Sequence, residues 1–415
     1  LNFSLGNFLG ASDIDIQRVN IIAGASSAFY GPNAFNGVIS METKSPFLFP
    51  GVMAEIKVGE RQMGQVQFRI ADYFNNEKGE QKFGYKLTAS YMQANDWEAE
   101  NYQPTQDSDF DETNPGGYDA VNRYGDENYE DRLNPTGQLD YPGLGAFYRT
   151  GYREVDLVDY STDNVKLNTA LFYKFNKETE LEYAFNYSGG STVYQGDNRY
   201  KLENIRFWQN KIELRNKGKY FLRAYSTNED AGDTYDIVAT GFELNDRAID
   251  NNQWFTSYAN RWRQPYSAGY KVQKLPGYPT YSPAVHDNVP NWIEKFLNPF
   301  LAQHQDSIRA WHEDIRALND GSGGGIYSPR FIPGTAVFDS VFQDITTRLF
   351  TDNGTRFFDR SALYHAQGEY IFTPSFGKIT VGANGRLYRP NSRGTILKDT
   401  GDVTITNYEG GVYSG

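Results

Sequence analysis

The sequence predicts a mainly β protein whose largest part is one antiparallel sheet of about ten strands, closed into a membrane-spanning barrel. Two observations carry this prediction. From Val52 onward, segments of about ten residues alternate apolar and polar side chains with period two, which is the length and pattern of a tilted membrane strand. Short turns and long connections also alternate between these segments. A small α+β segment precedes the sheet.

That α+β segment runs from Asp13 to Lys44. It predicts a strand at residues 19–22, one helical turn at residues 25–30 and a second strand at residues 38–43. β-branched residues favour the first strand, and Ser26 or Ser27 is available to cap the helical turn. Gly31 and Gly37 follow these elements at turns where we expect positive φ, because only glycine adopts it without strain.

Ten barrel strands follow, at residues 52–58, 65–73, 83–91, 164–175, 181–187, 203–215, 220–228, 361–372, 378–389 and 402–413. Tyr85 and Leu87 occupy the apolar phase of one strand, with Lys and Thr in the other phase. Tyr183 and Phe185 occupy the apolar phase of another. Because only alternate residues of a barrel strand face lipid, we expect these four side chains to do so.

The connections provide a second test of the barrel. Short ones, at residues 75–82, 176–179, 216–219 and 373–377, are predicted on one side. The other side carries the long connections 94–159 and 229–360, and the alternation is predicted to hold from the second connection on. A soluble β-sandwich is the alternative, but long loops of this size are uncommon in compact soluble domains.

Composition excludes several classes of function. The net charge of −12 argues against a nucleic-acid partner, because phosphate binding relies on clustered Lys and Arg. The 31 Tyr and 28 Phe suit the aromatic girdles of a membrane protein or a ligand-binding surface. No cysteine is present, and the four histidines have no recognised zinc spacing, so we expect no enzyme activity and no resident cofactor apart from a calcium ion.

The segment from Asp13 to Lys44 resembles the last part of the plug domain of TonB-dependent outer-membrane receptors. Five features fall in the family's order: Gly24, the run from Ser26 to Tyr30, Gly31, the Gly37-Val38-Ile39 triplet and the Thr43-Lys44 ending. Gln17, Asn20 and Ala23 depart from the family pattern, which usually has acids at the first two positions and a basic residue at the third.

The resemblance implies a fold and a partner. Residues 1–46 would be the C-terminal part of the plug domain, and residues 47–415 the N-terminal part of a barrel of about 22 strands in the bacterial outer membrane. The chain would then be an internal segment, since Leu1 is not a start methionine and the last residues lack a terminal aromatic. A TonB-type energy-transducing protein would act on a box upstream. The long aromatic loops resemble those of the large SusC-like receptors, which work with a surface lipoprotein.

The predicted outer loops carry the candidate binding residues. For ligand contact we select the aromatic residues Trp97, Tyr102, Tyr118, Tyr124, Trp254 and Trp262, with packing inside the loops as the alternative. Asp107, Asp109 and Asp111 begin a calcium-loop spacing that the following residues do not complete, so a solvated acidic loop is the alternative there. Apolar residues between Trp292 and Leu318 recur at helical spacing and predict a folded loop subdomain.

The function expected from these features is active import of a bulky or scarce ligand, such as a glycan, a peptide or a metal chelate, through a plugged barrel. A passive porin would have no plug segment. A surface adhesion or scaffolding protein built on the same barrel remains the alternative, and the sequence identifies neither the ligand nor the oligomeric state.

Overall fold

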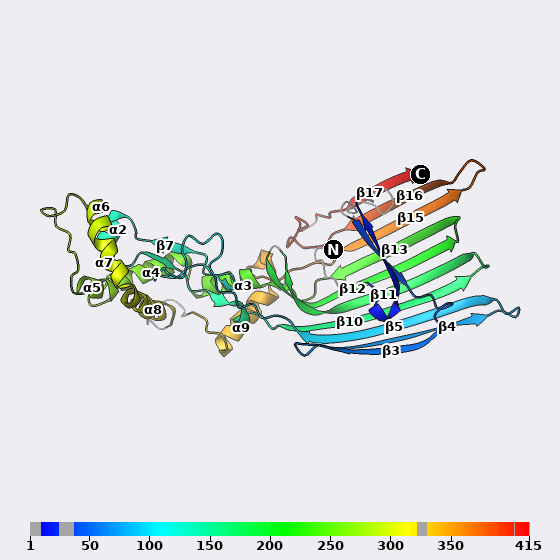
Figure 1. The fold of residues 1–415 in the computed structure, drawn as a ribbon, viewed down its shortest axis with the longest axis horizontal. Helices are drawn as coiled ribbons and strands as arrows, with labels where there is room; N and C mark the ends of the chain where they lie inside the picture. Colours follow the sequence, from blue (N-terminus) through cyan, green and yellow to red (C-terminus); the bar gives the residue numbers. More distant parts are fainter. Residues whose placement is uncertain (1–9, 25–36, 197, 322–329, 402, 415) are drawn as a thin grey trace.

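The computed structural model describes residues 10–24, 37–196, 198–321, 330–401 and 403–414 of the 415-residue chain. The protein is mainly β, and its largest sheet is antiparallel. Figure 1 shows two regions: the large, curved sheet, and an elongated region of helices and short strands that extends from one end of it. Among the described helices, none is long and apolar enough to cross a membrane.

The main sheet contains the ten predicted strands. They are β3 (Gly51–Val58), β4 (Gly64–Asn75), β5 (Gln81–Asn95), β10 (Ser161–Lys174), β11 (Thr179–Gln195), β12 (Arg199–Asn216), β13 (Tyr220–Asp230), β15 (Ala362–Phe372), β16 (Ile379–Arg389) and β17 (Asn407–Ser414). Each pairs with the next in chain order, and the short β14 (Tyr235–Asp236) pairs with β12. Within the described residues, β3 and β17 are the two edges of the sheet.

The two faces of this sheet differ in polarity, as the alternation predicted. On one face, which we call the apolar face, large apolar side chains are exposed, among them Leu87 (38% exposed) and Tyr183 (42% exposed). Tyr85 and Phe185 lie on the same face and are half-buried. On the opposite face, which we call the polar face, Arg69 and Thr88 are each 1% exposed. The predicted phase of these strands is therefore confirmed.

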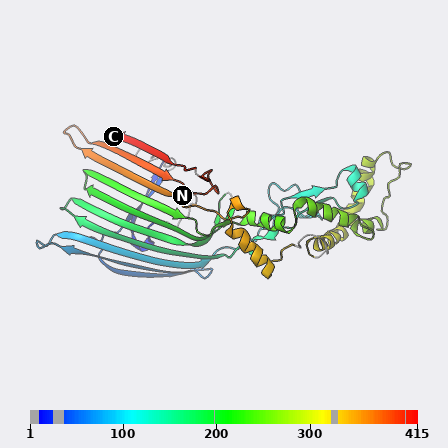
Figure 2. The ribbon, with the colours of Figure 1, turned by 180° about the vertical axis from the view of Figure 1, so that it is seen from behind.

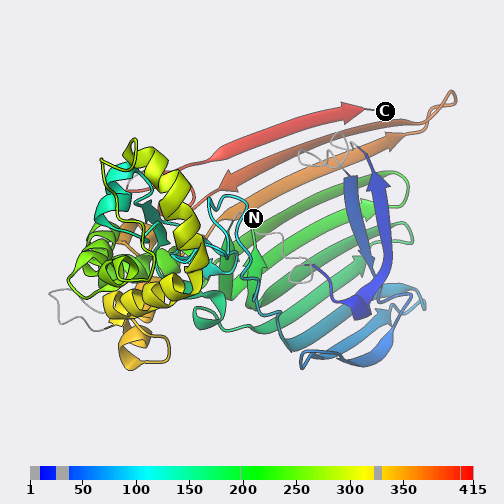
Figure 3. The same ribbon diagram turned by 60° about the vertical axis from the view of Figure 1, so that its left-hand side comes forward.

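A two-stranded hairpin covers part of the polar face. It consists of β1 (Ile16–Ala23) and β2 (Gly37–Thr43), which pair antiparallel from Ile16↔Thr43 to Ala23↔Gly37. A short 3-10 helix, η2 (Asp13–Asp15), precedes it. Figures 1 and 2 show the hairpin on one side of the main sheet only, and Figure 3 shows its strands running across those of the sheet. Both predicted strands of this segment are confirmed, while the predicted helical turn at residues 25–30 lies outside the described residues.

The predicted alternation of short and long connections is wrong at one place. The fifth connection, between β11 and β12, has only three residues, 196–198, although it lies on the side of the long loops. Residues 191–195 and 199–203 continue the two strands instead, with pairs such as Tyr194↔Tyr200. This extension forms because Leu202, Ile205 and Phe207 make a small buried cluster, with Tyr194 and Tyr200 packed against it.

The two long connections fold together into what we call the loop subdomain, residues 96–160 and 231–361. The first contributes β6 (Arg123–Tyr124), β7 (Tyr129–Asp131), α2 (Pro135–Asp140), β8 (Ala146–Tyr148), β9 (Tyr152–Arg153) and η3 (Glu154–Asp156). The second contributes α3 (Ile237–Ala248), α4 (Asn251–Arg263), α5 (Ala268–Gln273), α6 (Val289–Trp292), the π-helix η4 (Ile293–Leu297), α7 (Asn298–Gln303), α8 (Gln305–Gly321), α9 (Ala336–Thr347) and η5 (Phe350–Asp352).

Two hydrophobic clusters hold the loop subdomain together, and both contain residues from each long connection. In one, Leu144 and Phe147 of the first connection pack with Trp254, Trp262 and Ile315 of the second. In the other, Tyr124 and Leu157 pack with Ile237, Leu244 and Phe338. Of the apolar residues at helical spacing from Trp292 to Leu318, most are buried or half-buried inside a folded subdomain, as predicted, whereas Phe296 and Leu318 are each 48% exposed.

Candidate functional site

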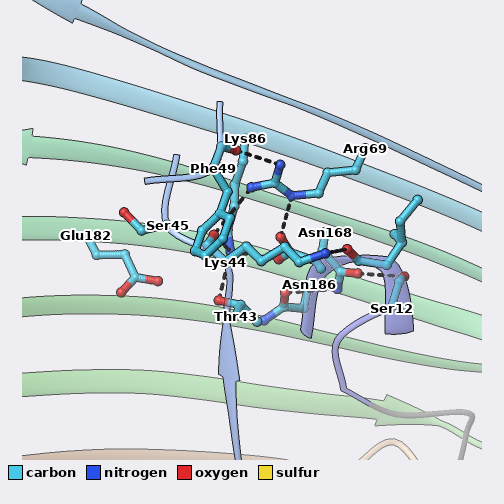
Figure 4. Close-up of polar contacts among 12 residues, drawn as sticks. Ser12, Thr43, Lys44, Ser45, Phe49, Arg69, Lys86, Asn168, Glu182 and Asn186 are labelled. Carbon is cyan, nitrogen blue, oxygen red and sulfur yellow. Dashed lines mark hydrogen bonds and ion pairs between the residues drawn. The ribbon is translucent and has the colours of Figure 1, made fainter. Parts of the chain in front are cut away.

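The contact between the hairpin and the polar face of the sheet is the first candidate site. Its centre is Asp15, the last residue of η2, whose carboxylate accepts two charged hydrogen bonds. Figure 4 shows both donors, Arg69 and Lys86. Arg69 Nε on β4 donates to Oδ1 at 2.7 Å, and Lys86 Nζ on β5 donates to Oδ2 at 2.7 Å. The side chains of Asp15, Arg69 and Lys86 are 2%, 1% and 7% exposed. One carboxylate of the hairpin segment thus pairs with cationic side chains on two strands of the main sheet.

The same two cations also bind backbone carbonyl groups that flank the hairpin. Lys86 Nζ donates to Lys44 O at 3.1 Å and to Thr43 Oγ1 at 2.8 Å, and Arg69 donates to Phe49 O at 2.9 Å. Lys44 N in turn donates to Asp15 O at 2.7 Å. Both ends of the hairpin are therefore fixed at one point of the sheet. Buried charges are tolerated only when they are paired and hydrogen-bonded in this way.

Charged pairs at the rim of this contact are of a different kind. Lys57 Nζ and Asp13 Oδ2 lie 2.8 Å apart, with side chains 35% and 49% exposed. Arg18 donates two hydrogen bonds to Glu42 within the hairpin, and Asn20 Nδ2 donates a third at 3.1 Å. Exposed ion pairs of this kind contribute about 0–1 kcal/mol. The buried pairs of Asp15 are therefore the stronger determinant of how the hairpin is seated.

A ladder of polar side chains continues across the polar face from the hairpin. Ser12 Oγ donates to Asn168 Oδ1 at 3.2 Å, and Asn168 donates to Asn186 at 3.0 Å (Figure 4). Asn186 then donates to Gln209 at 3.3 Å, and Gln209 donates to Thr227 at 3.0 Å. A cavity of about 570 Å³ lies at the far end of this ladder and is lined in part by these last three residues. Amide groups of this kind can exchange their partners for water.

Only part of the predicted glycine motif lies within the described residues. Gly37 has φ +151°, as the predicted positive φ requires, and a Cβ there would lie 2.7 Å from the carbonyl oxygen of Ile22. Gly24 has φ +91° with open space around it. Ser26, Tyr30 and Gly31 lie outside the described residues. The conformational need for glycine is therefore confirmed at Gly37, by both backbone angle and close approach.

The six candidate aromatic residues divide into two groups. Trp97 is 71% exposed, with the Arg61 guanidinium over its ring at 4.4 Å. Tyr102 and Tyr118 are half-buried, and the hydroxyl of Tyr118 donates to Tyr102 O at 2.8 Å. These three lie in the first long connection and reach its surface. They remain candidates for ligand contact.

The other three candidates are core residues of the loop subdomain. Trp254, Trp262 and Tyr124 are 1%, 0% and 5% exposed. Trp254 Nε1 donates to Asp320 Oδ1 at 2.9 Å, and Trp262 Nε1 donates to Pro142 O at 3.0 Å. Their polar atoms are satisfied inside the protein, and their rings offer no surface to a ligand in this structure. Packing within the loops, the alternative from the sequence, describes these three residues.

The predicted calcium residues are not assembled around one point. Asp107, Asp109 and Asp111 are all exposed. Asp109 accepts a hydrogen bond from the Tyr129 hydroxyl at 2.6 Å, and Asp111 accepts one from Thr113 N at 2.9 Å. In the part of the chain that the structure describes, a different group of acids has ligand atoms within 4.8 Å of one another: Asp119, Asp126 and Glu127.

The residues that seat the hairpin were missed at the sequence level. Arg69 and Lys86 lie in the polar phase of their strands, where a charge in the middle of a barrel strand indicates a partner inside the barrel. The sequence therefore contained a signal for Arg69 and Lys86. Asp15 as the partner was not predictable, because it is 54 residues from Arg69 and 71 from Lys86.

No protein family profile matches the chain, and no curated protein sequence is similar to it. Among solved structures, a mutant of the ferric enterobactin receptor from Pseudomonas aeruginosa is similar over 95% of this chain and 40% of its own, with 9% identity and a TM-score of 0.40. The siderophore receptor PirA from Acinetobacter baumannii is similar over 96% of this chain and 41% of its own, with 10% identity and a TM-score of 0.41. The ferric yersiniabactin uptake receptor FyuA from Yersinia pestis is similar over 96% of this chain and 49% of its own, with 11% identity and a TM-score of 0.34.

The chain thus spans less than half the length of these three proteins. Because the identities are 9–11% and the TM-scores lie below 0.5, these similarities carry no argument about the function of this chain.

Proposed function

We propose that this chain is part of a TonB-dependent receptor of the bacterial outer membrane. In this proposal the main sheet is part of the barrel wall, with its apolar face in lipid, and the hairpin β1–β2 belongs to the plug. The protein imports a ligand and is not an enzyme. The observation that carries the proposal is the inverted polarity of the main sheet, in which charged side chains such as Arg69, Lys86 and Lys166 are buried while aliphatic side chains such as Leu87 are exposed.

The exposed apolar side chains extend over neighbouring strands of the sheet. Phe68 on β4, Leu167 on β10 and Leu222 on β13 are 40%, 38% and 58% exposed. In water, contiguous apolar patches of this extent mark a surface that another apolar phase covers. The polar face carries Arg69 and Lys86 instead, and the hairpin covers them. A water-soluble sandwich would show the opposite arrangement, with its apolar side chains in the core.

The contact between the hairpin and the main sheet suits a plug that must remain bound inside the barrel at rest and must detach when it is pulled. It is built from ion pairs and amides rather than from a large hydrophobic core. Water can replace the partners of such groups, whereas exposing a hydrophobic core gains no compensating contacts. A TonB-type protein that pulled on the chain upstream of η2 would load Ser12 and Asp15 first. Release of Asp15 would leave Arg69 and Lys86 facing a wet channel.

For the outer side, we propose the large, SusC-like type of receptor, which captures a glycan or peptide together with a surface lipoprotein. The folded loop subdomain supports this type, because an extended, rigid outer structure provides a docking surface. The candidate ligand contacts are the exposed Trp97 and the half-buried Tyr102 and Tyr118. Alanine at these three positions should weaken ligand binding, and unchanged affinity in all three variants would contradict the assignment.

Uptake measurements in cells test the proposal. In the whole protein, uptake should require the inner-membrane energy transducer and should stop when that transducer is deleted. A scaffold or adhesin, the second candidate, would function equally without it. Mass spectrometry of material that co-purifies with the native protein would identify the ligand and so distinguish a glycan or peptide from a metal chelate. The identified ligand then serves in the uptake assay.

A further inference from the structure

A group of three acidic side chains lies inside the first long connection, beside β6. Asp119, Asp126 and Glu127 each place one carboxylate oxygen within 4.8 Å of the others. Asp126 is 1% exposed, and Asp119 and Glu127 are half-buried. These acids are distinct from Asp107, Asp109 and Asp111, which are exposed to solvent.

The hydrogen bonds of this acidic group are incomplete. One oxygen of Asp126 accepts from Arg123 Nε and, at 3.4 Å, from Ala120 N. Its other oxygen, Oδ1, is buried and has no donor, and the same is true of Glu127 Oε2. Asp119 accepts from Thr105 Oγ1 at 2.5 Å. A buried acceptor without a partner costs about 1–3 kcal/mol, so two of them beside each other indicate a missing partner.

The charges lead to the same conclusion. Among the described residues, these three carboxylates have one ion pair, between Asp126 and Arg123. A group of this kind must take up protons or a cation, because like charges at this separation destabilise each other.

We propose that Asp119, Asp126 and Glu127 bind a calcium ion. Calcium takes six to eight oxygen ligands in flexible geometry, and carboxylates and backbone carbonyls are its usual ligands in proteins. These three acids supply the charged part of such a set, with water and carbonyl groups completing it. Magnesium fits less well, since it demands a near-ideal octahedron and seldom takes an all-protein site.

The ion would stabilise the joint between the two long connections. Gly125, which precedes Asp126, accepts a hydrogen bond from Asn245 Nδ2 of α3 at 2.8 Å, and Tyr124 belongs to the cluster that packs on α3. A cation that ties Asp119 to Asp126 and Glu127 fixes this turn against the helix. Calcium would therefore order the loop subdomain without belonging to the hairpin contact or to the proposed transport path.

Calcium binding to the purified full-length protein tests this proposal, with chelator-treated protein titrated by calorimetry and by terbium luminescence. We expect one calcium site that Glu127→Gln weakens about tenfold or more. Asp109→Asn, in the same loop but outside the group, should bind as the parent does. Calcium should also slow proteolysis of the loop subdomain in the parent and not in Glu127→Gln.

Asp119→Asn gives the same decision if Glu127→Gln does not fold, because Asp119 is half-buried and its partner Thr105 can also bond an amide. The proposal is overturned if the parent binds no calcium. It is equally overturned if Glu127→Gln or Asp119→Asn binds calcium as the parent does, or if Asp109→Asn loses calcium binding instead.

Discussion

Replacing Asp15 by Asn should release the hairpin from the wall without unfolding the sheet. In the wild type, the carboxylate of Asp15 lies 2.7 Å from both Arg69 Nε and Lys86 Nζ, and all three side chains are nearly fully buried. An amide of the same size leaves the two buried cations beside each other without their ion-pair partner. Breaking a buried ion pair from one side costs about 3–5 kcal/mol. That cost changes the ratio of seated to released hairpin by about two to four orders of magnitude.

The assay is the permeability of cells that carry the full-length variant to a large antibiotic that the intact outer membrane excludes, with protease sensitivity of residues 10–49 as a second measure. Asp13→Asn is the matched control. It lies two positions away and removes the same charge, but its ion pair with Lys57 is exposed and contributes about 0–1 kcal/mol. Asp15→Asn should leak and Asp13→Asn should not, at equal amounts of assembled barrel.

Lys86→Met is a second control, because it leaves a different net charge in the buried group. The buried group carries one negative and two positive charges, so Lys86→Met leaves a neutral Arg69–Asp15 pair while Asp15→Asn leaves two unpaired cations. Lys86→Met should therefore be the milder change, although both remove the same 2.7 Å contact. If Asp15→Asn remains as tight as Asp13→Asn, or if Lys86→Met leaks more than Asp15→Asn, our account of how the hairpin is seated is refuted.

Three further outcomes are expected. Leu87→Arg should impair insertion into bilayers by about 2–4 kcal/mol, while Asn384→Arg, half-buried on the polar face, assembles normally; equal assembly would contradict the assigned faces. Gly37→Val should loosen the hairpin more than Gly24→Ala, because only the former adds a clash to the strain of positive φ; equal permeability of the two variants would exclude the clash as the cause. Burial lowers the pKa of His312 to about 3, so the unfolded chain takes up a proton there from about pH 6.5 downward while the folded state stays neutral. The protection factors of the loop subdomain against hydrogen exchange, corrected for the pH dependence of the intrinsic exchange rate, should therefore fall between pH 7 and pH 4. They should fall less in His312→Phe, and identical pH profiles of the two proteins would exclude this histidine as the source.

The period-two alternation of apolar and polar residues is sufficient to predict the main sheet. The ten strands, their order in the chain and the face on which Leu87 lies all follow from period two, because successive side chains of a strand point to opposite faces whatever surrounds it. Positive φ at Gly37 followed in the same way from a turn dipeptide. The helix α4 could have been predicted as well, since Trp254, Phe255, Tyr258 and Trp262 recur at helical spacing after Asp250, whose side chain caps the helix at Gln253 N.

Which distant residues come into contact depends on the tertiary fold and is not visible in the local pattern. Asp15 finds its two cations because the hairpin is laid across β4 and β5, and nothing within the segment itself fixes that placement. Trp254 and Trp262 are buried because the first long connection supplies Leu144 and Phe147 to cover them. Asp119 approaches Asp126 and Glu127, rather than Asp107 approaching Asp109 and Asp111, because the chain folds back through β6 and its pairing with β9. Alternation is a local property of a strand, whereas the contacts of Asp15, Trp254 and Trp262 depend on loop closure over tens of residues. The packed core must offset the entropy of that closure before these contacts can form.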